Sequence, residues 1–254
     1  MADRKVADFV YKSSMVDTTM VYKELFTKAD NVIDIGAFNG KDLKILTSRI
    51  GGNAIAIEAN PDMIPKLKER LKGQTIILGA ATNYTGITPF MQVESEYDDV
   101  VGMSSIQSFR LMEDKDAYSR YAMETATINE IFVPAVKMYS ILDSLCLDTV
   151  DLVKIDVGSH SWSVLEGFGQ RLWDVKMFHI ETEIQTLNEI NHRTSRQIAS
   201  FMNKNEFKLV RVYTEWGTDT QDHLYVNTRF SNADQYPDLY ETVMTNNIIE
   251  NRNF

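Results

Sequence analysis

The sequence predicts an α/β protein with a doubly wound, mostly parallel seven-stranded sheet. Apolar stretches of strand length alternate with amphipathic stretches of helix length along most of the chain. The first apolar stretch ends in a glycine turn, from Gly36 to Gly40, and the second ends in an acid, Glu58. Near the C-terminus two strand-like segments follow each other without a helix between them, which favours a hairpin at the sheet edge and a terminal antiparallel strand.

The composition is typical of one large soluble domain, residues 1–254, with 44% hydrophobic and 24% charged residues. A formal net charge of −10 and the absence of a basic stripe argue against a nucleic-acid partner. The basic segment at residues 66–72 is expected to be the solvated face of a helix. No stretch has the ~20 apolar residues of a membrane span, and no signal peptide is evident, so we expect no membrane partner and a cytoplasmic location.

The chain has one cysteine, Cys146, so it cannot form an intrachain disulfide, which suits a reducing compartment. Its neighbours are largely apolar, and we therefore expect a buried small hydrophobic side chain and not a nucleophile.

The first half of the chain contains the most regular alternation. We expect an N-terminal helical segment at residues 1–30, strands at 32–35, 54–58 and 75–80, and helices at 39–49 and 62–71. Asn60 and Pro61 are a favourable N-cap and first residue for the second of these helices. Gly73 suits its C-terminal end.

Residues 83–137 interrupt this alternation. They contain a possible short strand at 88–93, a loop signal at 102–106 and a charged, helix-like stretch at 110–130. Insertions of this kind in α/β enzymes are often substrate regions, and the alternative is a surface excursion without a role in binding.

Regular alternation returns in the second half. Strands are expected at 150–156, 177–183, 207–213 and 223–227, with helices at 160–172 and 194–203. A C-terminal helical segment at 236–254 is expected to dock on the core; the alternative is docking on a second subunit, and the sequence leaves the oligomeric state open. In parallel sheets of this kind ligands bind beyond the carboxyl ends of the strands, where Gly36, Glu58, Ala80 and Asp156 are all expected.

The glycine spacing distinguishes between two cofactor classes. A dinucleotide site needs G-x-G-x-x-G, but here Phe38 occupies the second glycine position and Lys41 the third. The observed G-x-x-x-G turn leaves little room for a pyrophosphate and favours S-adenosylmethionine (SAM), which has no phosphate, over NAD. Asp34 could then attract the amino group or hold the turn, and Glu58 could accept hydrogen bonds from the ribose. A turn without a ligand and a solvated Glu58 are the structural alternatives.

The chain also resembles the FkbM-type methyltransferases, a family of SAM-dependent O-methyltransferases. The resemblance spans residues 31–227 and is carried, in order, by VIDIGAFNGKD, AIAIEANP, GMSSI, KMYSILD, DLVKIDVGSHSWSVLEGF, HIETEI and QDHLYVN. It implies a class I SAM-methyltransferase fold, which is Rossmann-like. It also implies methyl transfer to a hydroxyl, often that of a sugar or another small molecule.

The resemblance assigns roles to residues at the strand ends. The cofactor-binding residues that it implies are Asp34, Gly36, Ala37, Phe38, Asn39 and Gly40 at the methionine end, Glu58 and Ala59 at the ribose, and Ser104, Ser105 and Asp156. Ser104 and Ser105 match a serine pair near the cofactor or substrate, and Asp156 is expected beside the sulfonium and the acceptor.

One segment departs from the family pattern. The family usually shows acid-Gly-x-acid after the K-x-D strand, whereas this chain reads Gly158-Ser159-His160-Ser161. Another residue could have taken over the role of these acids. Alternatively, the chain could be a non-catalytic SAM-fold binding or assembly protein.

Methyl transfer to a hydroxyl requires an aligned acceptor and removal of its proton. Our hypothesis assigns Asp156 as the orienting or proton-accepting carboxylate and His160 as the base, with Glu181 as a further candidate on the next strand. The alternative for His160 is a helix start capped by Ser159 or Ser161. No compact metal motif is present around these residues, and we expect no metal. The Asn-Pro-Pro-aromatic motif of base methyltransferases is also absent after this strand.

Overall fold

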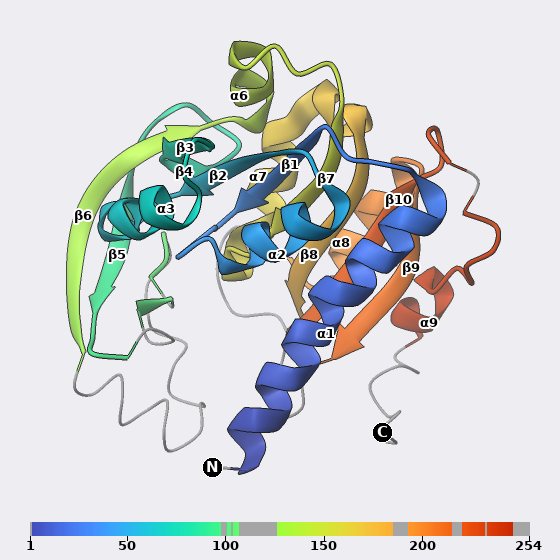
Figure 1. Cartoon of the computed structure of the whole chain (residues 1–254), viewed down its shortest axis with the longest axis horizontal. Helices are drawn as coiled ribbons and strands as arrows, with labels where there is room; N and C mark the ends of the chain where they lie inside the picture. The colour runs from blue at the N-terminus through green and yellow to red at the C-terminus, as the bar shows by residue number, and fades with distance from the viewer. Residues whose placement is uncertain are drawn as a thin grey trace.

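A computed structural model describes residues 2–97, 101–102, 104–106, 126–184, 193–214, 220–231 and 233–245. Its main sheet has seven strands in the order β3-β2-β1-β7-β8-β10-β9 (Figure 1). The strands are β1 Asn31–Ile35, β2 Asn53–Glu58, β3 Thr75–Leu78, β7 Val150–Ile155, β8 Val175–Glu183, β9 Phe207–Thr214 and β10 Thr220–Asn227. Only β10 runs antiparallel to its neighbours, β8 and β9. The predicted mostly parallel sheet with a late antiparallel strand is therefore confirmed.

Helices cover both faces of this sheet. One face packs against α1 Ala2–Leu25, α2 Lys41–Ile50 and α3 Ile64–Arg70, and the other against α6 Met138–Ser144, α7 Ser161–Phe168, α8 Ser195–Lys204 and α9 Tyr240–Met244. A short 3-10 helix, η1 Pro61–Met63, precedes α3. Two others flank α7: η3 Gly158–His160 precedes it and η4 Gly169–Asp174 follows it. Within β1, Val32 packs on the α1–α2 face and Ile33 on the α7 face, because successive side chains of a strand point to opposite faces.

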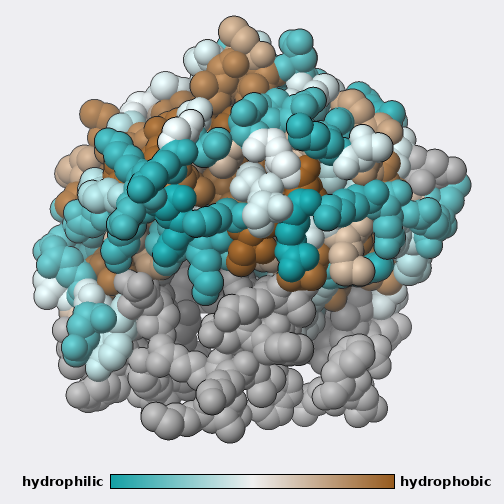
Figure 2. Space-filling view, in the orientation of Figure 1, coloured by the Kyte–Doolittle hydropathy of each residue, from teal (hydrophilic) through white to brown (hydrophobic). Residues whose placement is uncertain are grey.

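The N-terminal helices present a polar outer surface. Hydrophilic side chains cover much of the face shown in Figure 2, including the region over α3. Lys66, Lys68, Glu69 and Arg70 are exposed there, whereas Leu67 is buried. The basic segment is therefore the solvated face of a helix, as predicted.

None of the helices in the described ranges is long and apolar enough to cross a bilayer.

The interruption at residues 83–137 contributes two strands to a second sheet, and the strand just before it contributes the third. The strands of this sheet are β4 Ala80–Ala81, β5 Gly86–Glu94 and β6 Thr127–Val136, in the order β4-β6-β5. The strand predicted at 88–93 is confirmed. The helix predicted at 110–130 is wrong for residues 127–130, which pair with β5, and its residues 110–125 lie outside the described ranges. The strand predicted at 75–80 divides, because β3 ends at Leu78 and Ala80 pairs with β6.

The structure also places Cys146 and the C-terminal segment. Cys146 is exposed and not buried, because it follows the end of α6 with a positive φ of 51° and faces solvent. The C-terminal segment docks on the core as expected where it is described, since Val243 of α9 is buried and the Leu239 amide donates to the Leu209 carbonyl at 2.9 Å. Its residues 246–254 lie outside the described ranges.

Candidate functional site

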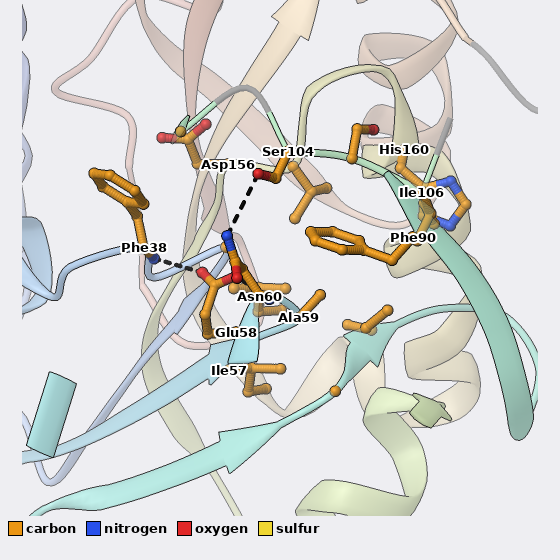
Figure 3. Close-up of a pocket in the computed structure, with 18 of the residues that line it drawn as sticks. Phe38, Ile57, Glu58, Ala59, Asn60, Phe90, Ser104, Ile106, Asp156 and His160 are labelled. Carbon is orange, nitrogen blue, oxygen red and sulfur yellow. Dashed lines mark hydrogen bonds between the residues drawn. The ribbon is translucent and has the colours of Figure 1, made fainter. Parts of the chain in front are cut away.

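The carboxyl ends of β1, β2 and β7 meet at one edge of the sheet and border a pocket (Figure 3). Its empty volume is about 600 Å³, part of it open to solvent. The pocket is lined by Ile35, Gly36, Phe38, Ile57, Glu58, Ala59, Asn60, Gly79, Ala80, Ala81, Phe90, Val101, Gly102, Ser104, Ser105, Ile106, Asp156, Val157 and His160.

The turn after β1 requires glycine at its first position. Gly36 has φ 80°, and a Cβ atom built there would lie 1.9 Å from the Asp156 carbonyl oxygen. The turn closes through a hydrogen bond of 2.7 Å from the Gly40 amide to the Ala37 carbonyl, and α2 begins at the next residue. Asn39 accepts a hydrogen bond from the Lys41 amide and contacts Arg70, away from the pocket lining. Of the predicted turn residues, Gly36 and Phe38 line the pocket, whereas Ala37, Asn39 and Gly40 shape the turn.

Glu58 is held in a fixed orientation at the pocket. It is 7% exposed, and its two carboxylate oxygens accept hydrogen bonds from the backbone amides of Phe38 at 2.6 Å and Asn60 at 2.7 Å. Burial raises the pKa of Glu58, although these amide hydrogen bonds oppose the shift. The carboxylate therefore links the end of β2 to the turn after β1, and Ala59 beside it completes this part of the lining.

Asp34 has an unusual environment for a carboxylate. It is 1% exposed, and neither of its oxygens has a hydrogen-bond partner among the described residues. The nearest cation is the Lys154 ammonium at 3.8 Å. Burial raises the pKa of Asp34 to about 7, because the attraction of Lys154 only partly offsets it. Asp34 does not line the pocket itself, but it lies two residues before Gly36, which does.

Asp156 belongs to a charged cluster at the end of β7. Its carboxylate lies 2.7 Å from the Lys154 ammonium, which also lies 3.1 Å from Asp42. Burial alone would raise the pKa of Asp156, but Lys154 and a hydrogen bond from Glu181 lower it overall. The negative charge of Asp156, together with burial, raises the pKa of Glu181 well above its usual value. The pair therefore favours a proton on Glu181, which donates to the Asp156 carboxylate.

His160 lines the same pocket from another side. Figure 3 shows its ring beside Phe90 and Ile106, apart from the Asp156 carboxylate. The residue is 7% exposed, and neither ring nitrogen has a hydrogen-bond partner within the described part of the chain. Burial lowers the pKa of His160 to about 4, so the ring is neutral at physiological pH. It lies at the end of η3, and no side chain caps the start of α7.

The sequence interpretation missed three polar side chains around the site. Lys154 could have been found, because a lysine within an apolar strand must lie beside carboxylates. Asn60 was assigned only as a helix cap, yet its side chain also contacts Gln92 and Ser104. Gln92 carried no signal in the sequence.

Across the described residues, no three His, Cys, Asp or Glu side chains are arranged to hold a metal ion.

Comparisons with known proteins give one family match. The model described as "Methyltransferase FkbM domain" matches residues 34–209 of the chain. A search of curated proteins gave no significant match.

Several solved structures are similar to this chain at low sequence identity. One is M. capricolum TrmK in complex with S-adenosyl-homocysteine, with 11% identity, coverage of 92% of this chain and 83% of that chain, and a TM-score of 0.43. A SAM-dependent methyltransferase from Aquifex aeolicus has 13% identity, coverage of 83% and 89%, and a TM-score of 0.41. The 16S rRNA methylase ArmA has 11% identity, coverage of 89% and 85%, and a TM-score of 0.39.

Proposed function

Since the chain belongs to the FkbM methyltransferase family, whose model matches residues 34–209, we propose that it methylates a hydroxyl group of a sugar or another small molecule. The family membership identifies a SAM-dependent methyltransferase with a class I fold. The expected fold and cofactor are thus both confirmed, and the hydroxyl acceptor is the new element of the proposal.

The described residues fit this cofactor. The Asp34 carboxylate, buried and without a hydrogen-bond partner among the described residues, suits the cofactor's amino group. The turn from Gly36 to Gly40, including Ala37, Phe38 and Asn39, would hold the methionine end, and the oriented carboxylate of Glu58, with Ala59, would hold the ribose. Ser104 and Ser105 would line the adjoining wall, and Asp156 would face the reacting end.

The bound cofactor supplies an electrophilic methyl group on a sulfonium. The chain's own contribution is to orient the acceptor and remove its proton. Asp156, ionised by Lys154 and hydrogen-bonded by Glu181, would orient the acceptor by accepting a hydrogen bond from a second polar group of that molecule. A ring nitrogen of His160 would accept the single proton of the reacting hydroxyl as its oxygen bonds to the methyl carbon and the carbon–sulfur bond breaks. Alignment is the larger contribution to the rate, and the base adds roughly 10²–10⁴-fold.

One observation supports this assignment above the others. A neutral histidine with two nitrogens that lack a partner among the described residues and an ionised aspartate line one pocket. An unpaired buried imidazole costs free energy, which an acceptor hydroxyl would recover by hydrogen bonding. The negative charge of the chain also argues against a nucleic-acid acceptor, and the single cysteine suits the cytoplasm.

The experiment is a labelled-methyl transfer assay. The purified protein is incubated with methyl-labelled SAM and separate panels of sugars, other hydroxyl compounds, amines and RNA. We expect label only in the hydroxyl panels, as a methyl ether in the product, and its loss with Asp156→Asn. Label in RNA or on nitrogen would contradict the proposal.

A non-catalytic role is the second candidate. It is favoured by the absence of acids at Gly158–Ser161 and by the low pKa of about 4 for His160, which makes the imidazole a weak base. This candidate predicts SAM binding without methyl transfer to any panel of the same assay.

A further inference from the structure

The described residues of the segment 101–106 form one wall of the pocket. Val101, Gly102, Ser104, Ser105 and Ile106 all line it. Ser105 forms an isolated antiparallel bridge with Met91 of β5. The Met91 amide donates to the Ser105 carbonyl at 2.7 Å, and the Ser105 amide donates to the Met91 carbonyl at 3.1 Å. The position of this wall therefore depends on β5.

The Ser104 hydroxyl has no hydrogen-bonding capacity left for a ligand. It donates to the Val101 carbonyl at 2.7 Å and accepts from the Val93 amide at 3.0 Å and from Asn60 Nδ2 at 3.4 Å. A hydroxyl offers one donor and two acceptor positions, and all three are occupied by protein groups. Ser104 thus acts by fixing the wall.

Asn60 joins this wall to the end of β2. Its backbone amide donates to Glu58 Oε1 at 2.7 Å, while its side chain donates to Ser104. Figure 3 shows Asn60 between Glu58 and Ser104, and it marks the hydrogen bonds from Phe38 to Glu58 and from Asn60 to Ser104. The orientation of one buried amide, 2% exposed, therefore relates the carboxylate of Glu58 to the wall.

Gln92 and the Asp62 backbone amide together set the orientation of Asn60, since the Asp62 amide also donates to Asn60 Oδ1 at 3.0 Å. From β5, Gln92 Nε2 donates to Asn60 Oδ1 at 3.1 Å and to Asp62 Oδ2 at 2.8 Å. Gln92 is 6% exposed and does not line the pocket. With Asn60 Oδ1 facing Gln92, its Nδ2 is directed to Ser104.

We propose that Gln92 is a positioning residue for cofactor binding, which acts through Asn60 and Ser104 to hold the 101–106 wall against the adenosine end of the pocket. This inference rests on the proposed role of Glu58 as the ribose ligand. Because the contacts join Glu58, Asn60 and Ser104, loss of Gln92 loosens the adenosine end and leaves the methionine end at Asp34 unchanged.

Two ligands separate these ends in a calorimetric titration. S-Adenosylhomocysteine has both the adenosine and the amino acid, whereas 5′-methylthioadenosine keeps the adenosine and lacks the amino acid. Gln92→Glu places a carboxylate against Asp62 with little change in shape. We expect the Kd of both ligands to rise by the same factor, about tenfold, because the variant loses both hydrogen bonds that Gln92 Nε2 donates, to Asn60 and to Asp62. Asp34→Asn is the matched control, and it should weaken S-adenosylhomocysteine alone.

The double variant Gln92→Glu with Asp62→Asn restores the contact between positions 92 and 62, but it leaves Asn60 Oδ1 without a side-chain donor. Because Gln92 acts through Asn60, the double variant should keep the weakened affinity, while Asp62→Asn alone should change the Kd little. Recovery of the wild-type Kd in the double variant would contradict this route. If Gln92→Glu does not fold, Gln92→Met removes the donors without adding charge and carries the same expectation. A folded variant with the wild-type Kd for 5′-methylthioadenosine, or a loss confined to S-adenosylhomocysteine, would overturn the inference.

The readout is binding, so the result does not depend on finding the acceptor. A wild-type protein that binds both ligands but methylates no hydroxyl would refute the proposed function and leave this test intact. With an acceptor in hand, Gln92→Glu should raise the KM for SAM and change kcat by less than about twofold.

Discussion

The ammonium of Lys154 lies 2.7 Å from the carboxylate of Asp156, two residues further along the chain. The same ammonium lies 3.1 Å from Asp42 of α2 and 3.8 Å from Asp34 of β1, and it is only 3% exposed. One buried cation thus serves carboxylates from three elements. The ionisation of Asp34 and Asp156 depends on it.

Replacing Lys154 by methionine should lower stability strongly. The variant leaves buried carboxylates without their counterion, which costs on the order of 3–5 kcal/mol. Urea denaturation of the ligand-free protein measures this loss. Lys176→Met, which removes the partner of Asp151 away from the pocket, is the control and should leave the Kd for SAM unchanged. Wild-type stability in Lys154→Met would refute the central role of this ammonium.

SAM affinity should depend on pH through Asp34. Only the ionised carboxylate attracts an ammonium group, and the pKa of Asp34 is about 7 in the folded protein. The Kd should therefore fall as pH rises from about 6 to about 8 and then level off, with a slope of at most about tenfold per pH unit. Titrations of wild type and Asp34→Asn should differ in this slope, and an equal slope in both would assign it to another group.

The stability of the ligand-free protein should show the opposite trend. The pKa of Asp34 is raised from 3.8 to about 7 on folding, so between these values the folded state binds more protons than the unfolded state. The contribution of Asp34 to the free energy of unfolding therefore decreases as pH rises from about 4 to about 7. Measuring the free energy of unfolding of Asp34→Asn and of wild type across this pH range isolates the contribution of Asp34. If the difference between the two free energies stays constant with pH, the raised pKa is not that of Asp34.

His160→Asn should reduce turnover and spare binding. We expect kcat to fall roughly 10²–10⁴-fold, with the Kd for SAM changed little. Because the pKa of His160 is about 4, the acid limb of the rate profile should lie near that value and not near 6.5. Full turnover by the variant on the true acceptor would remove His160 from the mechanism.

Gly36→Ala should abolish cofactor binding and destabilise the fold by about 1–3 kcal/mol, because its Cβ would overlap the Asp156 carbonyl oxygen. Gly73→Ala is a matched control, since Gly73 has a similar φ of 77° but no atom within 4 Å of the added Cβ. Thermal unfolding and SAM titration of both variants separate backbone strain from the clash. Equal effects of the two changes would show that strain alone is responsible.

Most of the main sheet was predictable because each strand and helix has its own periodicity in the sequence. The convergence of Gly36, Glu58 and Asp156 was also predictable, since the carboxyl ends of parallel strands meet at one edge. The strand at β6 was not, because residues 127–130 become a strand by pairing with β5. Cys146 was misjudged because apolar neighbours do not reveal which way a residue faces at a helix end.

The polar contacts of the site were harder to predict for a different reason. Gln92 and Asn60 are 32 residues apart, and their hydrogen bond depends on how the second sheet packs on the first. Likewise, the pKa of Glu181 is raised because folding places it against Asp156 and buries it. Such properties belong to pairs of residues and not to either one alone.

The shared Lys154 ammonium leaves the site with more carboxylates than cations, since Asp42 and Asp156 alone already outnumber it. Such a surplus favours the more positively charged of two otherwise similar ligands. The methyl donor carries a sulfonium charge, and the spent product has a neutral sulfur in its place. The same carboxylates should therefore bind the donor more tightly than the product, which favours release of the product after each transfer.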